Sequence, residues 1–161
     1  VDLDQRDGAT VQLENVHVTT VHGTRDTNHA DIVQTWAGPA CLRIDGLTGS
    51  TEYQGLFLLP TQFISTPPES VDLRRILIIG RSNNSAGKAG YLLWTQDDAG
   101  AWLATSHILL VDPRSDLSSV VWPTGQWTTG VTLARTTAFA SLPAGTPGLS
   151  YVSPGYIGRP A

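Results

Sequence analysis

The sequence predicts an all-β fold: a right-handed parallel β-helix of about four laps, followed by an irregular C-terminal extension. Three observations support this prediction. No segment carries the sustained apolar stripe of an amphipathic helix. Short runs rich in β-forming residues, separated by Gly, Pro, Asn and Asp, fill the chain instead. One apolar pattern also returns at intervals of 31, 29 and 32 residues, which is typical of a solenoid built from stacked laps.

The repeated pattern is apolar-x-apolar-x-x-apolar-x-apolar. Its four copies are Val11, Leu13, Val16 and Val18; Leu42, Ile44, Leu47 and Gly49; Val71, Leu73, Ile76 and Ile78; and, more weakly, Leu103, Thr105, Ile108 and Leu110. The side chains of a strand alternate with period two, so the extra residue in the middle of each copy reverses the phase. We therefore expect a bend or bulge between two short strands. The expected positions are Glu14-Asn15, Asp45-Gly46, Arg74-Arg75 and Ser106-His107.

A straight strand is expected between successive copies, at 31–36, 55–60 and 90–95. Alignment of the three runs at their first residues places Asp31 against Gly55 and Gly90. One face then carries Val33, Phe57 and Leu92, with Thr35, Leu59 and Trp94, and the outer face carries Ile32, Leu56 and Tyr91, with Gln34, Leu58 and Leu93. Strands that are apolar on both faces are usually covered on both sides. We expect a partner chain, the tail of this chain or a ligand to cover the outer face, and a homotrimer packed along its coil axes would do so.

Two regions are expected, with the laps in 1–122 and a capping or wrapping extension in 123–161. The extension contains no acidic residue and is rich in Gly, Pro, Thr and Ser. A disordered tail is the alternative, but the apolar residues of this segment favour packing on the last lap or on a neighbour. Because the sequence begins with Val1 and contains no Met, we expect a domain cut from a longer polypeptide.

Composition argues against two classes of partner. The formal charge is −4 and no basic stripe is present, so nucleic acid is not an expected partner. No apolar run approaches the roughly 20 residues that span a membrane, and no signal peptide is recognisable, so membrane insertion is not expected. Cys41 is the only cysteine and lies in an apolar stretch, which favours a buried, inert thiol.

Three runs resemble right-handed β-helix proteins of the pectin-lyase-like superfamily: 28–39 (NHADIVQTWAGP), 42–47 (LRIDGL) and 53–58 (YQGLFL). That superfamily often carries an Asn/His-x-Asp-Gly-Ile-Gln stretch, and the resemblance extends over 11–111. The ending 151–156 (YVSPGY) is similar to the ends of some tail proteins of phages that infect actinobacteria.

The resemblance implies a phage minor tail or tail-spike protein, or a bacterial surface protein, with a structural and glycan-binding role. It implies a homotrimer on a virion tail or cell surface, in contact with other tail or surface proteins and with host polysaccharide. The alternative is a polysaccharide lyase or glycoside hydrolase on the same fold. This sequence departs from the enzymes because Ile32 stands where Gly is common and because no further acid follows Asp31 in its column. A binding protein is therefore favoured over an enzyme.

The weak catalytic candidates are His29 and Asp31, which lie two residues apart at the start of a strand and could act as acid and base on a sugar. The favoured alternative is that Asn28 and Asp31 bond the backbone at a loop-to-strand junction. Asp97-Asp98 is expected at a hairpin tip.

No cofactor or metal site is expected. The three histidines His17, His22 and His29 lack the Cys or acid spacing of a zinc site.

Aromatic residues give the stronger functional indication, because sugar faces stack on aromatic rings while amides bond hydroxyl groups. The expected ligand-binding residues are Gln34, Trp36, Tyr53, Gln54 and Gln62. Among these, Trp36 and Tyr53 are expected to be exposed. For most of the other aromatic residues, packing in the core or in a trimer is the favoured alternative.

Overall fold

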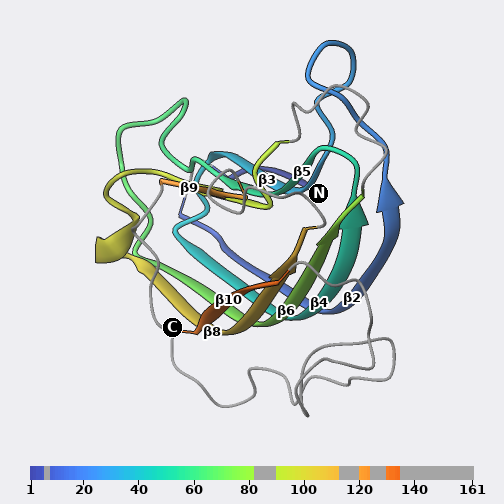
Figure 1. Ribbon diagram of the computed structural model, residues 1–161. Helices are drawn as coiled ribbons and strands as arrows, with labels where there is room; N and C mark the ends of the chain where they lie inside the picture. The colour runs from blue at the N-terminus through green and yellow to red at the C-terminus, as the bar shows by residue number, and fades with distance from the viewer. Residues whose placement is uncertain (6–7, 82–89, 113–119, 124–129, 135–161) are drawn as a thin grey trace.

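The computed structural model describes residues 1–5, 8–81, 90–112, 120–123 and 130–134. Within them the chain alternates between two five-stranded sheets that face each other (Figure 1). Sheet A contains β1 (Asp2–Asp4), β3 (Asp31–Ala37), β5 (Gln54–Leu58), β7 (Leu93–Thr95) and β9 (Val121–Trp122). Sheet B contains β2 (Thr10–Val21), β4 (Cys41–Thr51), β6 (Ser70–Gly80), β8 (Leu103–Val111) and β10 (Val131–Ala134). A short 3-10 turn, η1 (Ala99–Ala101), precedes β8.

All neighbouring strands in both sheets run parallel. The fold is therefore a parallel β-solenoid, which confirms the predicted class. It makes about three turns, slightly fewer than the four laps predicted.

Sheet B has the register that the repeat predicts. Val11 pairs with Leu42, Leu42 with Val71, and Val71 with Leu103. The second half of each copy aligns as well, so that a column runs through Val16, Leu47, Ile76, Ile108 and Val131. The stacking of equivalent apolar residues from lap to lap is thus confirmed.

Each lap of sheet B turns at a single residue with positive φ, which lies within β2, β4, β6 and β8 and directly before β10. These residues are Asn15 (54°), Gly46 (73°), Arg75 (49°), His107 (56°) and Gly130 (97°). The left-handed conformation turns the chain and lets the inward side chains continue in the opposite phase, which confirms the four predicted bends and adds a fifth. Only glycine adopts this conformation without a steric cost, so three of the five corners are strained.

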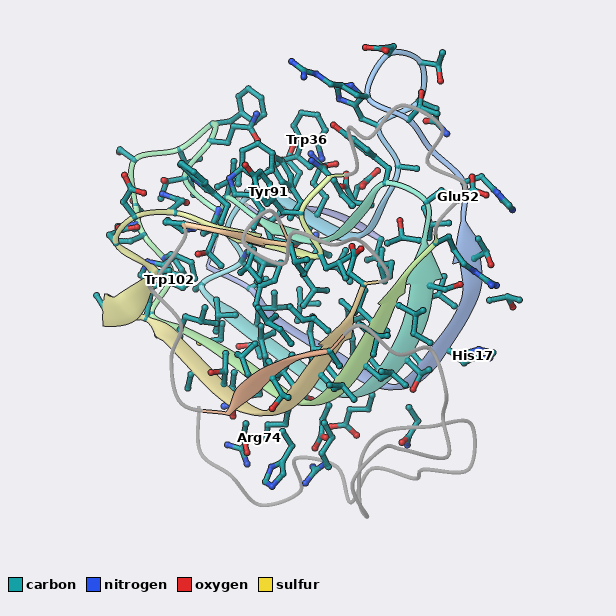
Figure 2. The ribbon with its side chains drawn as sticks, viewed as in Figure 1. His17, Trp36, Glu52, Arg74, Tyr91 and Trp102 are labelled. Atoms are coloured by element: carbon teal, nitrogen blue, oxygen red, sulfur yellow. The ribbon has the colours of Figure 1, made fainter. Side chains whose placement is uncertain are left out.

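Two arginine–carboxylate pairs lie at the corner of β6, where Arg75 has positive φ. Arg75 bonds both carboxylate oxygens of Asp45, whose side chain is 1% exposed, and its Nε lies 2.6 Å from Oδ1. The neighbouring Arg74 makes the same kind of pair with Asp72, but closer to solvent. The Arg74 side chain is 27% exposed and that of Asp72 is 20% exposed. Figure 2 shows Arg74 beyond sheet B, on the side away from sheet A.

The main core fills the space between the two sheets. Its largest fully buried side chains are Leu42, Ile44, Leu47, Leu56, Leu58, Leu73, Ile76, Ile78, Leu92, Leu93 and Ile108. A second apolar cluster of Leu77, Leu109 and Val111 lies on the opposite face of sheet B and is also buried. Cys41 is a buried free thiol, with its sulfur 3.8 Å from the Glu69 carboxylate.

The predicted register of sheet A is wrong. Val33 pairs with Leu56, and Leu56 with Leu93, rather than Val33 with Phe57 and Leu92. The second strand starts one residue earlier than predicted, at Gln54, because a tight turn closes just before it.

This error reversed the predicted faces of β5 and β7 but not of β3, because a shift of one residue moves every side chain of a strand to the other side. Four side chains that were predicted on the outer face belong to the core: Ile32, Leu56, Leu58 and Leu93. The column that points outward is Gln34, Phe57, Trp94 and Trp122.

Of the predicted extension 123–161, residues 131–134 form β10 and continue sheet B. Residues 124–129 and 135–161 lie outside the described part of the chain. Within the described ranges, no helix is long and apolar enough to cross a membrane.

Candidate functional site

The outer face of sheet A is aromatic. We call it the aromatic face and define it by Trp36, Phe57, Phe63, Tyr91, Trp94 and Trp122. Figure 2 shows the labelled Trp36 and Tyr91 on the side of sheet A that points away from sheet B. Two of its side chains are among the most exposed large apolar groups of the described chain, with Phe63 50% and Trp122 42% exposed.

One part of this face is a ring cluster on successive strands. The ring centroids of Phe57 and Trp94 lie 4.8 Å apart at an interplanar angle of 83°. Tyr91 makes a similar edge contact with Trp94 at 5.1 Å and a tilted contact with Trp122 at 5.8 Å. Edge-to-face contacts of this kind hold aromatic rings in fixed orientations. The cluster therefore presents rigid, partly exposed ring surfaces.

The other part is a stacked pair at the end of β3. The rings of Trp36 and Phe63 lie 5.3 Å apart at an angle of 16°. The Phe63 backbone N–H donates to the Trp36 carbonyl at 3.2 Å, which fixes the pair across the loop. Gln62 is exposed beside it. Trp36 and Gln62 were predicted as binding residues, whereas Phe63 was not, because its contact with Trp36 is made only by the folded loop.

A shallow cavity of about 450 Å³ opens beside the ring cluster. It is lined by Leu59, Trp94, Thr95, Gln96, Asp97, Asp98 and Trp122. Gln96 is held in place because its Oε1 accepts a hydrogen bond from the Thr61 backbone N–H at 3.0 Å. Asp97 and Asp98 are exposed and lie directly before η1, so their predicted place at a hairpin tip is wrong.

A separate group of titratable side chains surrounds the start of β3. Asp31 has its pKa raised from 3.8 to about 7, first by burial and then by the negative charge of Asp2, while His29 opposes the shift. Its buried Oδ1 atom has no hydrogen-bond partner. Burial and the charge of Asp31 also raise the pKa of Tyr53, and the Tyr53 ring lies 5.3 Å from that of His29.

This group joins candidates that the sequence identified separately. His29 is exposed and its Nε2 contacts the Arg25 carbonyl oxygen, so it belongs to the loop before β3. Asp31 pairs with Gln54 rather than with Gly55. The structure thereby brings His29, Asp31, Tyr53 and Gln54 to one end of sheet A.

Three of the predicted binding residues are less accessible than a ligand contact requires. Tyr53 is 7% exposed, so its predicted exposure is wrong. Gln54 and Gln34 are also buried, at 5% and 9%. Gln62 is exposed and Trp36 is half-buried rather than exposed as predicted, and these two are the predicted residues that remain accessible on the aromatic face.

The histidines are dispersed. His22 pairs with Glu52 at 3.0 Å, His17 lies on β2 in sheet B, and His29 lies in the loop before β3. Among the residues that the structure describes, no group of three or more His, Cys, Asp or Glu side chains is placed to hold a metal ion.

Comparison with protein-family models, with curated proteins and with solved structures gave no significant match. The solenoid is therefore assigned from its own strand pairing.

Proposed function

We propose that this β-solenoid binds polysaccharide through the aromatic face, as a segment of a phage tail protein or of a related cell-surface protein. The observation that carries the proposal is the accessible aromatic surface on sheet A: Trp36 on β3 and Trp122 on β9 lie on regularly spaced parallel strands, and Phe63 stacks on Trp36 from the loop after β5. The tail or surface setting rests on the sequence resemblance alone.

Glycans suit this surface for two reasons. The apolar faces of sugar rings pack on aromatic rings, and the sugar hydroxyls need hydrogen-bond partners at the edges. The aromatic face supplies both, since the exposed amide of Gln62 and the carboxylates of Asp97 and Asp98 lie beside the rings. Trp36, Trp94 and Trp122 lie on strands, which hold binding residues more rigidly than loops do.

A homotrimer remains part of the proposal, with other tail or surface proteins as neighbours and host polysaccharide as ligand. Light scattering tests the assembly: a mass of three chains at micromolar concentration is expected, and a monomer at all concentrations contradicts it.

Binding is tested by incubating the protein with purified actinobacterial envelope polysaccharide and measuring both retention and released oligosaccharide. We expect retention without release. Trp36→Ala and Phe63→Ala should weaken retention at least fivefold, while Glu69→Gln, an exposed change on sheet B's side, should not. Equal retention of all variants contradicts binding through the aromatic face.

A second candidate function is supported by Asp31. A carboxyl group with a pKa of about 7 beside a second acid is suited to protonate a leaving group, as the general acid of a glycoside hydrolase does. Under this alternative the same incubation releases oligosaccharide, and Asp31→Asn abolishes the release while leaving retention unchanged.

A further inference from the structure

We propose that the cavity beside Trp94 and Trp122 is a subsite for one ring of a neutral sugar polymer, and that it excludes acidic polysaccharides. This inference rests on the proposed function and names the class of glycan. It concerns a part of the aromatic face that the sequence did not identify as a site.

The walls of the cavity provide the stacking surface. Trp94 and Trp122 sit on adjacent parallel strands, in register, and both contact the Tyr91 ring. Parallel strands lie about 4.8 Å apart, and the Tyr91 ring contacts both indoles, so the three rings form one continuous aromatic surface. The exposure of Trp122 at 42% leaves this surface accessible.

The polar lining of the cavity consists largely of hydrogen-bond acceptors. Asp97 and Asp98 supply exposed carboxylates, and the Gln96 amide is already held by Thr61. Carboxylates accept strong hydrogen bonds from hydroxyl groups. The described lining contains no Lys, Arg or His that could neutralise a carboxylate on the ligand. A hydroxyl-rich neutral ring is therefore favoured, and a uronic acid ring meets two like charges.

The position of the cavity also indicates an extended ligand. Trp36 lies on β3 and Trp122 on β9, three strand spacings apart, or about 14 Å. A single sugar ring cannot contact both. We infer that a chain of several sugars crosses the strands of sheet A, with one end on the Trp36–Phe63 stack and the other in the cavity.

The test uses fluorine NMR of protein that contains 5-fluorotryptophan. The five tryptophans give five signals, which single Trp→Phe variants assign. The probes are mannohexaose and cellohexaose as neutral chains and hexagalacturonate as an acidic chain. We expect a neutral hexasaccharide to shift the signals of Trp36, Trp94 and Trp122 and to leave that of Trp102, which is 7% exposed, unchanged.

Two variants separate the subsite from the rest of the face. Trp122→Ala should weaken binding of the neutral chain at least tenfold. The double change of Asp97→Asn with Asp98→Asn should weaken neutral binding, because two charged acceptors become neutral amides, and should allow hexagalacturonate to bind. Glu69→Gln controls for the loss of charge, and circular dichroism checks that each variant is folded.

The outcomes are distinct. Neutral binding that shifts Trp36 but neither Trp94 nor Trp122, or wild-type protein that prefers hexagalacturonate, overturns the subsite and leaves the proposed function standing. Absence of binding by all three probes overturns the neutral-glycan subsite, and the envelope-polysaccharide assay then decides the proposed function separately.

Discussion

Replacement of Arg75 by Ala should destabilise the solenoid by about 3 kcal/mol. Asp45 is 1% exposed, and Arg75 supplies a guanidinium that bonds both of its carboxylate oxygens across adjacent laps. Removal of one partner of a buried pair costs about 3–5 kcal/mol because the remaining charge is left without compensation. We take the lower end because the Arg75 side chain is 25% exposed and water can enter the space that it leaves.

The neighbouring pair provides the matched control. Arg74→Ala removes the same two-pronged contact with Asp72, but both side chains are partly exposed. Exposed ion pairs contribute up to about 1 kcal/mol, so Arg74→Ala should cost no more than that.

The assay is urea unfolding followed by tryptophan fluorescence. With an m-value of about 2 kcal/mol/M, Arg75→Ala should lower the midpoint by about 1.5 M and Arg74→Ala by less than about 0.5 M. The double variant Arg75→Ala with Asp45→Leu should recover part of the loss, because no charge remains buried. Equal costs for the two single variants would refute the argument, since the larger cost is predicted from the burial of the Asp45 carboxylate.

Three further outcomes are expected. Gly55→Ala should lower the free energy of unfolding in urea by more than about 3 kcal/mol, because the new Cβ would collide with the Leu92 backbone carbonyl. Gly100→Ala is the control: its Cβ meets nothing within 4 Å, so the change should stay within about 0.5 kcal/mol. Similar urea midpoints for the two variants would contradict this. The folded-state pKa of Asp31 is raised to about 7, so stability should be highest below about pH 4 for this group and fall as pH rises towards 7. Asp31→Asn should flatten that fall in melting temperature between pH 4.5 and 7.5, and an unchanged slope would exclude Asp31 as its source. His107→Gly should raise stability by about 1 kcal/mol by relieving positive φ, while His107→Val should lower it; thermal melts that rank the two in the reverse order would exclude strain at this corner.

Sheet B could be predicted from the sequence because its signal is redundant. Four copies of one pattern, each with an extra residue at the same place, determine both the register and the bend. The φ of Arg75 and His107 shows that the position of the bend follows from the pattern even where the residue type opposes it. Agreement among several copies outweighs local conformational preference.

Sheet A could not be aligned in the same way. Its strands are short, joined by loops of unequal length, and apolar on both faces around Leu56 and Leu58, so the sequence gives no alternation that identifies the inner side. The pattern favours alignment of Asp31 with Gly55, yet the turn before Gln54 moves the start of the strand by one residue. The exchange of faces hid the outward column of Phe57, Trp94 and Trp122.

The candidate site was predictable only where one strand carries it. Trp36 and Asp31 are found from β3 alone. The contact between His29 and Tyr53 and the cavity beside Trp94 and Trp122 join segments that are brought together by sheet A's pairing. Because the predicted register of sheet A is wrong by one residue, the sequence predicts neither the His29–Tyr53 contact nor the cavity.

The left-handed corner of each lap has a consequence for how such a chain can grow. Leu42 and Val71 occupy equivalent positions, so the 29 residues from Leu42 to Ser70 form one complete unit with its own corner at Gly46. Tandem duplication of this segment would add one parallel strand to each sheet, and each new strand would pair with its neighbours as the present strands do. The coil can therefore change its length by whole units, and with each unit the outer surface available to a long partner molecule would extend by one strand spacing.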